Sequence, residues 1–167
     1  MPRSTATRSL RSTRWVNAPK AISGARAVRE VFTPKVDHSV ASVAVRVRRI
    51  SGSNALAIRL ETSTGTVVAR GQIAAASIGT SPTWVSASLS SAVVLKAGRG
   101  YRLVLTAPST STYSAFAIKR GTNYHFAAAT YFNDGYGQYT SGSGWVGFDQ
   151  PGGSTNNTNS DLQFYLR

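Results

Sequence analysis

The sequence predicts an all-β protein, an antiparallel β-sandwich, and three observations lead to that fold class. After residue 29, apolar and polar residues alternate with a period of two, which is the pattern of half-buried strands. Turn clusters rich in Gly and Pro separate these segments at intervals of about 8–12 residues, as in sandwiches and barrels. No segment has a clear helical period. The 167 residues suffice for one domain with a core of its own.

The clearest strands are Val40–Ile50 and Ala55–Glu61, where apolar and polar residues alternate over most of each segment. Their apolar positions, expected to face the core, are Val43, Val45, Val47, Leu56, Ile58 and Leu60. Because residues 51–54 form a Ser-Gly-Ser-Asn turn cluster, we predict that the two strands pair as a hairpin. The hairpin would bring the arginines of both strands together as a basic strip on one sheet face. The strip would consist of Arg46, Arg48, Arg49 and Arg59.

Further strands follow in the same alternating pattern. They are predicted at 66–70, 84–89, 93–95, 101–106, 113–119, 123–132 and 161–166. Between them, Ala74–Ser77 is expected to form a single helical turn.

Positive charge is concentrated at the N-terminus. The net charge is +13, and residues 1–50 contribute +9 of it through eleven basic and two acidic residues. We therefore divide the chain into a basic N-terminal arm, residues 1–28, and a β-sandwich domain, residues 29–167. The arm is expected to dock on neighbouring subunits through Arg3, Arg8, Arg11, Arg14, Trp15, Lys20 and Arg26. A solvated tail and a mitochondrial transit peptide are the alternatives for this segment.

Two targeting features and one residue type are missing from the sequence. The first residues lack the apolar run of a Sec signal peptide, so we do not expect export by that route. No stretch approaches the roughly 18 apolar residues of a membrane span. The chain has no cysteine, which excludes disulfides and thiolate metal sites.

The order of several motifs is characteristic. A leading segment Val31–Pro34 (VFTP) is followed by the pair Trp84-Val85 and then by Val94–Leu105 (VLKAGRGYRLVL). Over residues 29–167 this order resembles the jelly-roll accessory modules, akin to carbohydrate-binding modules, that occur in bacterial secreted and phage proteins. The resemblance implies a jelly roll with a ligand-binding or adhesive role and no catalytic centre.

The arm distinguishes this chain from those modules, which commonly follow a signal peptide and a large catalytic domain. A free jelly roll with a basic arm and no export signal is typical of a virion component that is assembled in the host cytoplasm. We therefore expect a non-enzymatic structural or adhesion protein, a phage head-decoration or tail component, located in the virion and forming a homo-oligomer. A free-standing carbohydrate-binding module is the alternative.

The best candidate for ligand contact is the segment from Tyr124 to Trp145, which holds close to half of the aromatic residues. Sugars present apolar C–H faces and hydroxyls, so their sites pair a flat ring with amide or carboxylate groups. A Gly-rich loop in this segment would supply both kinds of group to a cell-surface glycan. The expected glycan-binding residues are Asn133, Asp134, Tyr136, Gln138, Tyr139 and Trp145. Core packing or subunit contact is the alternative role for the rings.

Catalytic chemistry is poorly supplied. The two histidines, His38 and His125, stand in no hydrolase or metal-ligand spacing. Asp134 and Asp149 are the best carboxylate pair for a glycosidase, and no motif supports them. We expect no enzyme activity, no catalytic residue, no cofactor and no bound metal. A calcium site would have to draw its oxygen ligands from Asn133, Asp134, Asp149, Asn156, Asn157 and Asp161.

A small icosahedral coat protein with an RNA-binding arm is the rival from another class. Such arms neutralise packaged nucleic acid with dense runs of Arg and Lys. Seven basic residues in the first 29 are sparse by comparison. We therefore do not expect nucleic acid as the partner.

Overall fold

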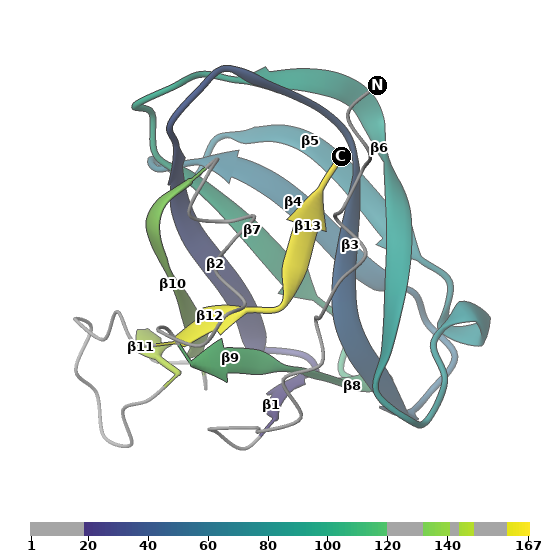
Figure 1. The fold of residues 1–167 in the computed structure, drawn as a ribbon. Coiled ribbons are helices and arrows are strands. Elements are labelled where there is room, and N and C mark those ends of the chain that lie inside the picture. The colour runs from purple at the N-terminus through teal and green to yellow at the C-terminus, as the bar shows by residue number, and fades with distance from the viewer. Residues whose placement is uncertain (1–18, 120–131, 141–143, 149–159) are drawn as a thin grey trace, which may run out of the picture.

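The computed structural model describes residues 19–119, 132–140, 144–148 and 160–167 (Figure 1). Over these residues the chain is all-β with antiparallel sheets, which confirms the predicted fold class at that level. The elements are β1 (Lys20–Ile22), β2 (Ala27–Pro34), β3 (His38–Ser51), β4 (Leu56–Thr62), β5 (Val67–Ile73), η1 (Ala75–Ser77), β6 (Thr83–Leu95), β7 (Tyr101–Thr106), β8 (Thr112–Ala115), β9 (Ala117–Lys119), β10 (Phe132–Thr140), β11 (Trp145–Gly147), β12 (Ser160–Leu162) and β13 (Phe164–Leu166). Within the described ranges, no helix is long and apolar enough to span a membrane.

Most strands belong to two sheets that share one core (Figure 1). The six-stranded sheet has the order β11-β10-β2-β7-β4-β5. In the five-stranded sheet, β6 pairs with one edge of β3, while β8 and β13 share its other edge and β1 lies outside β8. β9 and β12 form a separate pair. We call this arrangement the two-sheet body.

The core between the sheets follows the predicted alternation. The six apolar positions expected to face it are at most 1% exposed: Val43, Val45, Val47, Leu56, Ile58 and Leu60. Because a slip of one residue would turn every one of these side chains outward, the pattern specifies the register of both strands. The predicted helical turn is also present, as η1.

The predicted hairpin is wrong. β3 pairs with β6, β8 and β13, whereas β4 pairs with β5 and β7 in the other sheet. The predicted basic strip does not form either, because Arg59 lies on the six-stranded sheet and the arginines of β3 lie on the five-stranded one.

Where the chain crosses between the sheets, the turn after β3 is hydrogen-bonded to the turn before β8. The Asn54 backbone N–H donates to Ser111 Oγ at 2.9 Å, and Asn54 Nδ2 donates to Thr110 Oγ1 at 2.8 Å. The Tyr113 hydroxyl donates to the Asn54 carbonyl oxygen. Gly52 has a φ of +83°, and a Cβ there would overlap Ser111, so glycine is required at that point.

Several predicted strands differ in extent. The predicted strands 84–89 and 93–95 are one strand, β6, which bulges opposite Val40 and Ser42. The predicted strands 113–119 and 161–166 each divide into two short strands. The first divides into β8 and β9 and the second into β12 and β13. β8 and β13 pair with successive parts of β3, whereas β9 and β12 pair with each other. Of the predicted strand 123–132, only its last residue is described, and it begins β10.

The end of the predicted arm belongs to the two-sheet body. Lys20–Ile22 forms β1 against β8, and Ile22 is fully buried. Ala27 and Val28 begin β2 and are also buried. Residues 1–18 lie outside the described part of the chain.

Candidate functional site

The predicted Gly-rich loop is a strand, and this is a correction. β10 pairs with β2 on one side and with β11 on the other. Its glycines allow close packing, since a Cβ on Gly137 would overlap the ring of Phe148 and one on Gly135 would press against Glu30. Composition indicated a loop because Gly is common in both settings, and only the packing partners separate the two.

This strand divides the predicted glycan-binding residues between its two faces. Gln138 is the register partner of Arg29 and lies on the outer side of the six-stranded sheet with Tyr136, two residues away. Neighbouring side chains cover Gln138, which is only 3% exposed. Tyr139 pairs with the fully buried Val28 and packs against the core, and the Lys20 ammonium lies 4.4 Å from its ring centroid. Tyr139 therefore points away from Tyr136 and Gln138.

The remaining three predicted residues lie at or beside the same strand. Trp145 of β11 is the register partner of Thr140 and is half-buried on the outer face. Asn133 and Asp134 lie on β10 where its register against β2 shifts, and their side chains are outside the described part.

On the outer face of the six-stranded sheet, Arg29 contacts both Gln138 and Trp145. Its Nε donates to Gln138 Oε1 at 2.8 Å, and its guanidinium carbon lies 4.1 Å from the centroid of the Trp145 ring. β2 directs this side chain outward because its neighbours Val28 and Glu30 face the interior, at 0% and 2% exposure. An Arg stacked on an indole gains cation–π attraction while its edge still donates hydrogen bonds. Sequence analysis missed this role because nothing local pairs β2 with β10 and β11.

Three further arginines share the outer face of the six-stranded sheet. Arg59 and Arg70 are register partners on β4 and β5, and Arg102 of β7 pairs with Val31 of β2. Glu61 accepts a hydrogen bond from Arg59 Nε at 2.8 Å and is the one carboxylate among the described side chains of this face. We call the surface made of Arg29, Arg59, Arg70, Arg102, Tyr136, Gln138 and Trp145 the arginine face.

The charges of this face act on each other. Burial, and after it the positive charge of Arg102, lowers the pKa of Arg29 to about 10, while Tyr136 and Glu61 act in the opposite direction. Arg29 therefore keeps its charge at neutral pH although it is half-buried beside another cation. The arrangement is suited to a group that brings negative charge or accepts hydrogen bonds.

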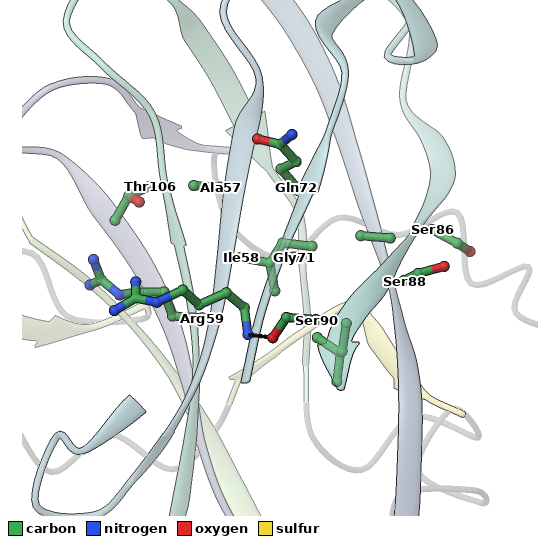
Figure 2. Close-up of a pocket in the computed structure, with 12 residues that line it drawn as sticks. Ala57, Ile58, Arg59, Gly71, Gln72, Ser86, Ser88, Ser90 and Thr106 are labelled. Atoms are coloured by element: carbon green, nitrogen blue, oxygen red, sulfur yellow. Dashed lines mark hydrogen bonds between the residues drawn. The ribbon is translucent and has the colours of Figure 1, made fainter. Parts of the chain in front are cut away.

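A groove of about 700 Å³ continues the arginine face where β5 meets β6 (Figure 2). β5 approaches closely because Gly71 has no side chain, and a Cβ there would lie 2.9 Å from the Ser88 carbonyl oxygen. The Arg70 backbone N–H donates to Ser90 Oγ at 3.2 Å, the dashed bond in Figure 2. The polar residues that line the groove are Arg59, Arg70, Gln72, Ser86, Ser88, Ser90 and Thr106, and the hydroxyls of Ser86 and Ser88 are directed away from β5 (Figure 2). It offers guanidinium, amide and hydroxyl groups to a ligand.

Two of the predicted docking residues are described. Lys20 lies over Tyr139, and Arg26 closes the turn between β1 and β2 through two backbone hydrogen bonds of 3.0 Å with Ser23. Arg3, Arg8, Arg11, Arg14 and Trp15 lie outside the described residues.

The residues considered for catalysis and calcium are dispersed or outside the described ranges. His38 begins β3. Its neighbour Asp37 accepts hydrogen bonds from Lys96 Nζ at 2.7 Å and from the Ala97 N–H at 2.9 Å, and the Lys96 bond is the main reason that the pKa of Asp37 is lowered. Asp161 is buried on β12. In the part of the chain that is described, no three His, Asp or Glu side chains gather as a metal site. His125, Asp149, Asn156 and Asn157 fall outside it.

Comparison with known proteins identified no relative that shares this site. No protein-family model matches the chain, and no curated protein matches it significantly. A functional assignment therefore depends on the residues of the arginine face.

Proposed function

We propose that this chain is a non-enzymatic structural or adhesion protein, a phage head-decoration or tail component, whose two-sheet body is a jelly-roll β-sandwich that faces outward and binds glycan. The observation that carries the glycan role is the arginine face. It combines a half-buried indole, a half-buried phenol and guanidinium groups on one side of a sheet, with the buried amide of Gln138 holding Arg29 in place.

The chemistry of this set matches that of a sugar. A pyranose packs its C–H face on a flat ring and directs its hydroxyls to hydrogen-bonding groups around the ring. Trp145 supplies the ring and Arg29 holds it from one side. Because Arg29 is itself bonded to Gln138, the set is ordered before a ligand arrives, which reduces the entropy that binding costs.

The glycan role is tested by retention of the protein on immobilised polysaccharides. Trp145→Ala should abolish retention, because it removes the ring. Trp84→Ala is the matched control, since Trp84 lies on the other sheet. Equal retention of both variants would exclude the arginine face as the site.

The virion role is supported by the basic arm and tested by its deletion. The deletion is limited to residues 1–18, because Ile22 and Val28 are buried in the body. We expect the truncated protein to fold and to lose particle incorporation, and light scattering should show a smaller assembly at about 0.15 M salt than the full chain forms. Particle incorporation without residues 1–18 would contradict the docking role of the arm.

The alternative, a free-standing carbohydrate-binding module, gives a different pair of results. The full chain would then be a monomer at about 0.15 M and about 0.5 M salt, and Trp145→Ala would still abolish retention.

A further inference from the structure

The arginine face carries more positive charge than a neutral sugar requires. Its described side chains include four guanidinium groups and one carboxylate, Glu61, which is bonded to Arg59. Arg29 makes its hydrogen bond to a neutral amide and has another cation, Arg102, close enough to lower its pKa. A neutral ligand would leave this repulsion in place, whereas an anionic ligand would offset it.

The cations are arranged as a row across the strands. Arg29, Val104, Arg59 and Arg70 are successive register partners on β2, β7, β4 and β5. Since neighbouring strands lie about 4.8 Å apart, the row spans about 14 Å. Val104 is 1% exposed but is not part of the core cluster, as expected for an apolar residue between two long arginine stems.

Both ends of the row provide groups for the uncharged parts of a sugar. One end is the indole of Trp145, stacked on Arg29. The other end is the groove at β6, where the Ser90 hydroxyl lies beside Arg70 and β5 contributes the amide of Gln72 (Figure 2). Charge in the middle, with a ring at one end and uncharged hydrogen-bonding groups at the other, corresponds to an extended chain of charged sugars.

We propose that the arginine face and the adjoining groove bind an acidic polysaccharide, a sugar chain with carboxylate or sulfate groups, which lies across the strands from Trp145 towards β6. This inference rests on the proposed glycan role and specifies its ligand class. A guanidinium group matches both anions because its fork of N–H donors bonds two oxygens at once. Single-stranded nucleic acid fits less well, because its binding surfaces stack successive bases on a series of rings, whereas the described part of the arginine face has one indole, Trp145, and one phenol, Tyr136.

The test uses the full chain and polymers that differ only in charge. Binding to dextran, carboxymethyl-dextran and dextran sulfate is measured by calorimetry, with alginate as a natural uronate chain. Arg29→Gln, and separately the double variant Arg59→Gln with Arg70→Gln, should weaken binding to the acidic polymers about ten-fold or more. Arg46→Gln is the matched control, because Arg46 also bonds a Gln side chain but lies on the five-stranded sheet. If circular dichroism shows that Arg29→Gln does not fold, the Arg59→Gln/Arg70→Gln double variant, whose side chains are more exposed, tests the proposal.

Each outcome supports or overturns a stated part. Preference for carboxymethyl-dextran and alginate identifies the anion as carboxylate, and preference for dextran sulfate identifies it as sulfate. Equal binding of neutral dextran, unchanged in the arginine variants, overturns the acidic ligand but leaves the glycan role standing. Binding to no polysaccharide overturns both. Equal binding of polyglutamate or polyuridylate would show a surface for polyanions in general and overturn the sugar specificity.

Discussion

The outer faces of the two sheets use the same residue types in different arrangements. On the five-stranded sheet, the rings of Trp84 and Tyr165 pack on each other with centroids 4.4 Å apart, and Arg46 donates to Gln163 Oε1 at 3.3 Å. On the arginine face, the indole packs on a guanidinium group instead. Burial alone lowers the pKa of Arg46, whereas Arg29 is also repelled by a second arginine.

The difference separates a packing role from a binding role. A ring that faces another ring contributes mainly apolar contact and stability. A ring that faces a cation beside other cations leaves a charged, hydrogen-bonding surface that a ligand can complete. The two faces therefore serve as each other's control, and four predictions test the comparison.

The largest loss of stability is expected from Gly137→Ala, which acts on the core side of β10, beneath the arginine face. The added Cβ overlaps the Phe148 ring, so β10 and β11 must separate, at a cost of up to about 3 kcal/mol in unfolding free energy. Denaturant unfolding measures it. Gly79→Ala is the control, because the nearest atoms to a Cβ there are 3.9 Å away. Equal stability of the two variants would show that Phe148 moves aside without cost.

The two tryptophans should respond in opposite ways. Trp84→Ala removes the ring partner of Tyr165 and should lower the unfolding free energy by about 2 kcal/mol without changing ligand retention. Trp145→Ala should change retention more than stability. Melting temperature and polysaccharide retention, measured on both variants, test whether one loses mainly stability and the other mainly binding. A loss of both properties in both variants would remove the distinction between the faces.

Tyr165→Phe should leave stability unchanged or raise it by about 1 kcal/mol, because the buried Tyr165 hydroxyl has no hydrogen-bond partner among the described residues. Burial also raises the pKa of Tyr165 above 10.0. The stability that this shift provides is complete below about pH 10 and is lost as the pH rises through the raised value. Unfolding at about pH 8 and about pH 11 should therefore show a smaller alkaline loss in the variant. A larger alkaline loss would contradict the prediction.

The smallest stability effect is expected from Glu61→Gln. The amide can still accept the hydrogen bond from Arg59, whose side chain is 36% exposed, so unfolding free energy should change by less than about 0.5 kcal/mol. Binding of an acidic polymer should strengthen by about two- to five-fold, because the variant removes a negative charge from the face. Calorimetry with carboxymethyl-dextran measures this, and weaker binding would count against an anionic ligand.

Local alternation predicted what lies inside. The valines of β3 and the leucines and isoleucine of β4 are buried as expected, because a period of two assigns each side chain to a face whatever the strand pairs with. β7 also has the predicted bounds, Tyr101–Thr106. The sequence likewise indicated Tyr136, Gln138 and Trp145 as candidates, and these three share one face.

Pairing between distant strands was decided by the tertiary structure alone. β4 crosses to the other sheet instead of following β3 as a hairpin, and the turn between them is bonded through Asn54 to a turn more than fifty residues away. The site depends on the same kind of contact, since Arg29 meets Gln138 only because β2 lies beside β10. By itself the sequence determined the strand class and the core positions, which are local properties. The sheet order and the arginine face depend on which strand edges meet, and no local pattern encodes that.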